Sequence, residues 1–168
     1  MNKGLNARTA ETIGMAQRGG SVVSHVRTGR DIASPQIPQG SADVLIGFEP
    51  GEAAANLGYL KKGGTLIVCS SEIKPVTAAL GKSDYDGMAS VRWLKDTVDK
   101  CYVIDPDEIC QACGSPKVLN VAMVGALAAT GEMDITVEEI EKALAVKLKP
   151  QLLDMNIKAL HIGAEKIR

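Results

Sequence analysis

The chain has 168 residues, of which 45% are hydrophobic and 23% charged, and its 19 Lys and Arg nearly balance its 20 Asp and Glu. These values predict a single globular domain over residues 1–168, and the balanced charge gives no general attraction to nucleic acid or membrane surfaces. The longest apolar stretch, residues 118–129, is too short to cross a bilayer, and the N-terminus lacks a secretory signal, so we expect a cytoplasmic protein.

Residues 14–29, GMAQRGGSVVSHVRTG, set an Arg between a Gln and two glycines directly before an alternating strand. Gly19 and Gly20 permit a positive φ that turns backbone N–H groups toward a ligand, and Arg18 offers a fork of donors for a carboxylate or phosphate. Taken alone, the pattern favours a glycine turn with a solvated Arg.

The strand that follows has two distinct sides. One side carries Val22, Ser24 and Val26, and the other carries Val23, His25 and Arg27. We expect an apolar face and a wet or ligand-facing side with His25 and Arg27. Spacing alone favours a hydrogen-bonded surface histidine over a catalytic one.

Three short apolar runs predict parallel strands at residues 44–48, 66–69 and 102–104. A helix is expected over residues 51–60, and Gly63 and Gly64 are expected to turn the chain into the second of these strands. Because the runs do not alternate, both faces of the sheet should be covered. The prediction is an α/β fold with an open, mostly parallel sheet and helices on both faces.

The last third of the chain is predicted to be helical. An apolar helix over residues 117–130 should end at Gly131, and Thr136 with Glu139 should form a capping box. A final helix should begin at Pro150. Its expected buried stripe is Leu153, Ile157, Leu160 and Ala164.

Ligands of open parallel sheets bind beyond the carboxyl ends of the strands. This rule selects Glu49, Ser70, Ser71 and Asp105 as rim residues. Asn120, a polar side chain in the apolar helix, either joins this rim or bonds to a neighbouring backbone group, with the second slightly favoured.

The four cysteines are Cys69, Cys101, Cys110 and Cys113. Only the last two have metal-ligand spacing, and one such pair without further ligands indicates inert thiols more than a metal site.

Four segments occur in one order: GMAQRGGSVVSHVRTG, ADVLIGFEPGEAA, LKKGGTLIV and NVAMVGALAATG. With Pro150, Asn156, Ala159 and Gly163 near the end of the chain, they resemble the gamma-type domain of 2-oxoacid:ferredoxin/flavodoxin oxidoreductases. The resemblance implies a Rossmann-like domain in a complex that oxidatively decarboxylates an arylpyruvate to acyl-CoA and CO2 and reduces ferredoxin.

It also implies that thiamine diphosphate, Mg and 4Fe-4S clusters belong to a large alpha subunit, that CoA is a co-substrate and that this chain alone is inactive. A pyruvate or 2-oxoglutarate version, or a stand-alone CoA- or nucleotide-binding module, remain alternatives.

In this context the opening motif is better interpreted as a place where ligand and partner chain meet. The expected contact residues are Gln17, Arg18, Gly19, Gly20, Ser24, His25, Arg27, Glu49, Ser70 and Asn120.

Members of this family usually begin with a strand and a GxGGQG turn, and roughly thirty such residues have no equivalent before MNKGLNARTAE. Either Met1 is an internal methionine taken as a start, or the chain is shortened. A shortened chain would lack a central strand, and its exposed sheet edge would favour a homodimer or dependence on the partner.

Overall fold

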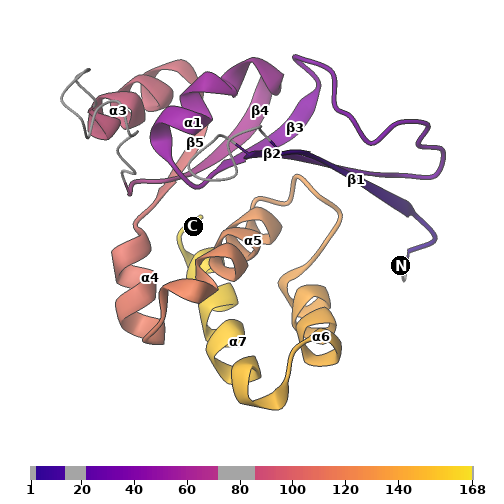
Figure 1. Ribbon diagram of the computed structural model, residues 1–168, viewed down its shortest axis with the longest axis vertical. Helices are drawn as coiled ribbons and strands as arrows, with labels where there is room; N and C mark the ends of the chain where they lie inside the picture. Colours follow the sequence, from indigo (N-terminus) through magenta and orange to yellow (C-terminus); the bar gives the residue numbers. More distant parts are fainter. Residues whose placement is uncertain (1–2, 14–21, 72–85, 168) are drawn as a thin grey trace.

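The computed structural model describes residues 3–13, 22–71 and 86–167. These residues form a two-stranded antiparallel ribbon, a three-stranded parallel sheet and a set of helices that cover the sheet on both faces (Figure 1). The predicted α/β class, with a parallel sheet and a helical last third, is confirmed.

The ribbon consists of β1 (Asn6–Ile13) and β2 (Val22–Gly29), which pair over their whole lengths. The predicted alternation is present in β2, but its direction is opposite to the expected one. His25 is buried, whereas Val22 and Val26 are 64% and 54% exposed. The side of β2 with His25 faces inward because the His25 ring contacts the Ile37 backbone N–H and the Tyr59 ring. The side with Val22 and Val26 is left open to solvent.

The parallel sheet has the order β3 (Ala42–Gly47), β4 (Leu60–Cys69), β5 (Lys100–Ile104). Strand β4 begins before the glycine pair, so the turn expected there is wrong. Gly63 adopts a φ of +73° inside the strand, and the register against β3 shifts between Ala42 and Val44.

One face of the sheet is covered by α1 (Pro50–Ala55), the short η1 (Leu57–Tyr59) and α3 (Gly87–Thr97). The helix predicted over residues 51–60 therefore ends early and continues as a 3-10 turn. Leu66 and Val68 of β4 are fully buried against this layer.

The other face is covered by α4 (Pro106–Cys113), η2 (Pro116–Val118), α5 (Leu119–Ala129) and α7 (Pro150–Glu165), visible as a separate layer in Figure 1. Ile67 and Cys69 of β4 point into this layer and are fully buried. Alternate residues of one uniformly apolar strand thus fill two cores, as expected for a strand inside a parallel sheet.

The helical last third follows the predicted boundaries closely. Gly131 takes a φ of +69° after α5. The capping box of Thr136 and Glu139 is present at the start of α6 (Val137–Lys147), and α7 begins at Pro150.

The predicted buried stripe of α7 is only half correct. Leu160 and Ala164 are buried, but Leu153 and Ile157 are half-buried. The contact with α5 is made instead by small residues, because a Cβ on Gly163 would lie 1.9 Å from the carbonyl oxygen of Ala122. Small side chains let the two backbones touch, and this closeness decides which face of α7 is buried.

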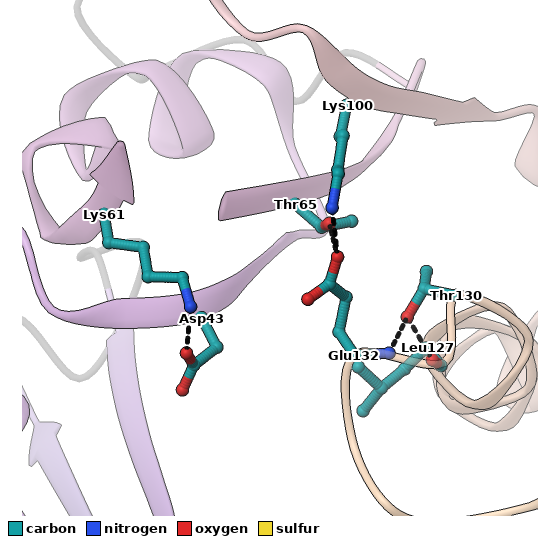
Figure 2. A network of polar contacts seen from close by, with 7 residues as sticks. All are labelled: Asp43, Lys61, Thr65, Lys100, Leu127, Thr130 and Glu132. Carbon is teal, nitrogen blue, oxygen red and sulfur yellow. Dashed lines mark hydrogen bonds and ion pairs between the residues drawn. The ribbon is translucent and has the colours of Figure 1, made fainter. Parts of the chain in front are cut away.

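Glu132, after the end of α5, ties the helical layer to the sheet (Figure 2). Its Oε1 accepts hydrogen bonds from Thr65 Oγ1 at 3.0 Å and from Lys100 Nζ at 2.6 Å. The bond from Lys100 and then that from Thr65 lower the pKa of the Glu132 carboxyl. Nearby, Lys61 Nζ lies 2.5 Å from Asp43 Oδ1 and joins β4 to β3.

Within the described residues, no single helix is long and apolar enough to cross a membrane. The pair of α4 and the η2–α5 segment reaches that length and composition only together, with a bend of 116° between its two parts.

Candidate functional site: a groove between two strand edges

A groove of about 760 Å³ opens between β2 and β3. Its walls include every residue of 22–28 and of 41–49, and α5 adds Val124 and Leu127. Since successive side chains of a strand point to opposite faces, a wall made of consecutive residues is the edge of a strand. The groove therefore lies between two strand edges.

Both edges lack a strand partner in the described part of the chain. There, β3 pairs only with β4, and β2 pairs only with β1. Each strand thus turns its second edge, with alternate backbone N–H and C=O groups, toward the groove.

His25 lies in the groove wall with a defined orientation. It is 8% exposed, and its Nδ1 accepts a hydrogen bond from the Ile37 backbone N–H at 3.2 Å. A neutral ring that accepts at Nδ1 carries its proton on Nε2, so Nε2 is its donor. The ring meets Tyr59 edge to face, with centroids 5.2 Å apart and an interplanar angle of 79°. The histidine is held as an oriented donor on strand β2.

Glu49 lies at the carboxyl end of β3 and is 9% exposed. Its Oε2 accepts a hydrogen bond from the Glu52 backbone N–H at 2.7 Å and so caps α1. Its Oε1 is buried, and among the described residues it has no hydrogen-bond partner. A buried carboxylate oxygen without a donor is costly, and this one borders the groove.

Arg27 and Ser24 also line the groove, in different ways. Arg27 is half-buried, and its Nη1 donates to the carbonyl oxygens of Ser34 at 2.8 Å and Gln36 at 3.2 Å. The guanidinium thus holds the loop between β2 and β3. Ser24 is exposed.

The other rim residues lie apart from the groove lining. Ser70 and Asp105 follow β4 and β5 at the same edge of the sheet as Glu49, as the parallel arrangement requires. Asp105 caps α4 through the Asp107 N–H at 2.9 Å. Ser71 is exposed after β4.

Asn120 is exposed on α5. Its Oδ1 accepts from the Val121 N–H at 3.0 Å, which is the neighbouring backbone bond that the sequence slightly favoured.

Gln17, Arg18, Gly19 and Gly20 lie outside the described residues, and their roles stay predictions. Tyr59 and Phe48 line the groove but were absent from the sequence-based candidates. No motif marks either one, since Tyr59 looks like the end of a helix and Phe48 like the end of a buried strand.

Cys110 and Cys113 both lie on α4 and are half-buried. In the described part of the chain, no three His, Cys, Asp or Glu side chains are close enough together to hold a metal ion. Burial raises the pKa of the Cys69 thiol to about 12.

A smaller hollow of about 300 Å³ lies between the start of β4 and the end of α3. It contains none of the predicted site residues. The groove is therefore the better candidate site.

Three curated relatives match almost the whole chain. Each is an indolepyruvate oxidoreductase subunit IorB: that of Archaeoglobus fulgidus is 38% identical over 97% of this chain and 81% of its own length. The Thermococcus kodakarensis protein is 31% identical over 98% and 83%, and the Pyrococcus horikoshii protein is 30% identical over the same shares.

Two solved structures share the fold. The gamma subunit of a keto/oxoacid ferredoxin oxidoreductase from Geobacter sulfurreducens superposes with a TM-score of 0.67 and 21% identity, over 99% of this chain and 82% of that one. The pyruvate oxidoreductase subunit PORC from Thermotoga maritima gives 0.61 and 23%, over 98% and 81%.

The family model described as pyruvate ferredoxin/flavodoxin oxidoreductase matches residues 1–166. With a match of this length and relatives above 30% identity, the chain belongs to the pyruvate ferredoxin/flavodoxin oxidoreductase family.

Proposed function

We propose that this chain is the smaller subunit of a thiamine diphosphate-dependent oxidoreductase that acts on indolepyruvate or a related arylpyruvate. The observation that carries the proposal is the nearly full-length match, at 30–38% identity, to relatives named as subunits of an indolepyruvate oxidoreductase. In the proposed reaction, the 2-oxoacid is oxidatively decarboxylated, acyl-CoA and CO2 are released, and ferredoxin accepts the electrons.

The covalent chemistry falls to a large alpha subunit in this proposal. Following the family resemblance, the proposal places thiamine diphosphate, Mg and the 4Fe-4S clusters on the partner, and the isolated chain is expected to be inactive. We assign the complex to the cytoplasm.

The groove supplies the contact side of this subunit. Its oriented His25 donor and the buried Glu49 oxygen, which has no partner among the described residues, suit recognition of another molecule rather than bond-breaking chemistry. A catalytic role would need a second proton-transfer group or a nucleophile aligned with His25. In the described part of the chain, His25 contacts the Ile37 backbone N–H and the Tyr59 ring.

The test is to co-express this chain with a large thiamine diphosphate-dependent subunit and purify the complex without oxygen. We expect CoA-dependent reduction of ferredoxin with indolepyruvate for the complex, and none for either subunit alone. Faster turnover of pyruvate or 2-oxoglutarate than of indolepyruvate would replace the arylpyruvate assignment.

The alternative of a stand-alone module is tested on the isolated chain. Calorimetric titration with CoA should show no binding at micromolar concentration. Tight binding by the isolated chain, together with failure to copurify with a large subunit, would favour the module instead.

A further inference from the structure

We infer that the hollow between the start of β4 and the end of α3 is a binding site for an amino acid zwitterion with a large apolar side chain. The hollow measures about 300 Å³, and the residues that line it do not line the groove. The inference rests on three features: two opposite charges without ion-pair partners among the described residues, apolar walls, and room for a ring together with a charged head.

A bulge in β4 builds one side of the hollow. Between the pairs Ala42–Leu60 and Val44–Thr65, β3 advances from residue 42 to 44 while β4 advances from residue 60 to 65. The extra residues of β4 push the segment out of regular pairing, and Gly63 takes a φ of +73° there. Residues 61–64 line the hollow, so the bulge gives it a lysine-bearing wall that a regular strand would not form.

The charges of the hollow indicate a ligand that carries both signs. Lys61, Lys62 and Asp99 line it. Lys61 Nζ lies 2.5 Å from Asp43 Oδ1, so its charge is already neutralised. Among the residues that the structure describes, neither the Lys62 nor the Asp99 side chain has a hydrogen-bond or ion-pair partner, and both residues are exposed. A ligand with one carboxylate and one ammonium satisfies both, whereas a ligand with a single charge is attracted by one and repelled by the other.

The apolar walls indicate what the rest of the ligand is. Leu57 of η1, Leu60 of β4 and Val98 after α3 line the hollow, and each is half-buried. Leu60 lies directly against Gly64, because a Cβ on this glycine would be 2.7 Å from Leu60 Cδ1. Walls of this kind, with a few polar groups between them, favour a small molecule with an apolar body.

The volume sets the size of the ligand. A cavity of about 150 Å³ holds a benzene ring, so a hollow of about 300 Å³ has room for a ring and for the ammonium and carboxylate beside it. L-phenylalanine matches this description and is the probe that we choose. Because the two charges are exposed, each ion pair contributes little, and we expect a dissociation constant on the order of 1 mM.

Titration of the purified chain with L-phenylalanine, followed by NMR of methyl groups, tests the site. The signals of Leu57, Leu60 and Val98 should shift together with one dissociation constant. The signals of Val146 should not move, because this residue lies on α6 outside the hollow. If the three residues give no shifts at about 10 mM L-phenylalanine, the site does not exist.

Three related compounds test the assignment of a zwitterion with an apolar side chain. Phenylpyruvate lacks the ammonium, phenethylamine lacks the carboxylate and L-alanine lacks the ring. Each should bind at least roughly threefold more weakly than L-phenylalanine, since each loses one of the expected contacts. If phenylpyruvate or phenethylamine binds as tightly as L-phenylalanine, the hollow does not recognise both charges and the assignment is wrong.

Two variants with matched controls test the two charges. Lys62→Gln and Asp99→Asn change exposed side chains, so the chain should fold, and each should weaken binding of L-phenylalanine roughly threefold to fivefold. Asp99→Asn should also reduce the preference over phenylpyruvate, because the repulsion of its carboxylate is gone.

The controls are Lys95→Gln and Asp96→Asn, which make the same changes at exposed positions of α3 outside the hollow. Both should bind L-phenylalanine as the parent chain does. Variants of Lys62 and Asp99 that bind like these controls would overturn the inference. These measurements do not involve turnover, so their outcome is independent of the proposed function.

Discussion

The contact between α5 and α7 depends on two glycines, and replacing either one with alanine should destabilise the chain. A Cβ on Gly125 would lie 2.0 Å from the carbonyl oxygen of Leu160. The reciprocal contact, from Gly163 to the carbonyl oxygen of Ala122, is 1.9 Å. Both clashes involve backbone atoms, so no side-chain rotation relieves them.

The expected cost follows from the distance that the helices must move. An ordinary contact begins at 3.4 Å, so Gly125→Ala requires the helices to separate by the difference between 2.0 and 3.4 Å. A gap of about 1 Å already removes up to half of the dispersion energy across an interface, and overpacking costs about 1 to 3 kcal/mol or more. Because both clashes are with backbone atoms, we take the upper end of this range, about 3 kcal/mol. Helix propensity returns about 1 kcal/mol, so a net loss of about 2 kcal/mol is expected.

Urea unfolding of the purified chain, followed by circular dichroism, measures this loss. For a chain of this size, a loss of about 2 kcal/mol in the free energy of unfolding corresponds to a Tm lowered by about 4 to 8 °C in thermal unfolding. The double variant with Gly163→Ala should cost less than the sum of the two single changes, because the first change already parts the helices.

Gly58→Ala provides the matched control. Nothing lies within 4 Å of its added Cβ, and its φ is not in the left-handed region. It should change the free energy of unfolding by no more than about 1 kcal/mol, toward higher stability. If Gly125→Ala proves as harmless as this control, the close backbone contact is not what holds the two helices together.

Three further predictions concern single side chains. Glu132→Gln removes the charge that pairs with Lys100. Because folding lowers the pKa of Glu132, the charged carboxylate stabilises the chain above the ordinary pKa of 4.5, and this stabilisation is lost on acidification. In urea unfolding, the free energy of unfolding of the variant should therefore fall less than that of the parent between neutral pH and pH values below about 4. Cys69 should not react with a thiol reagent at about pH 8 in the native chain, because it is buried and its pKa is raised. Cys69→Ala should therefore lower the number of reactive thiols only in denaturant. If the native variant loses a rapidly reacting thiol, Cys69 is not buried. Thr136→Ala removes the N-cap bond to the Glu139 N–H and should lower the free energy of unfolding by about 1 kcal/mol, and an unchanged value would show that the cap does not stabilise α6.

Most of the sheet and helices could be predicted from local patterns. The apolar run of residues 66–69 predicts a strand buried on both faces, and the structure shows this. The glycine pair before it was misinterpreted as a turn, because Gly63 has the same positive φ in a bulge as in a turn. Sequence alone does not distinguish these two uses.

The candidate site was harder to predict, because contacts with residues distant in sequence decide which side of β2 is buried. The pattern predicts an alternating strand, but not which side faces the protein. His25 turns inward because Ile37 and Tyr59, distant in sequence, provide its partners. Glu49 was selected by the rule for strand ends, and it does line the groove. The part of the opening motif at Gln17 to Gly20 remains untested.

The Glu132 bridge has a consequence for how the groove is maintained. It anchors the segment after α5 to Thr65 of β4 and Lys100 of β5 (Figure 2). Helix α5 supplies the Val124 and Leu127 part of the groove wall, and this anchor restrains it whether or not the groove is filled. The α5 part of the groove wall is therefore tied to the sheet before any molecule binds, which lowers the entropy cost of ordering that part on binding.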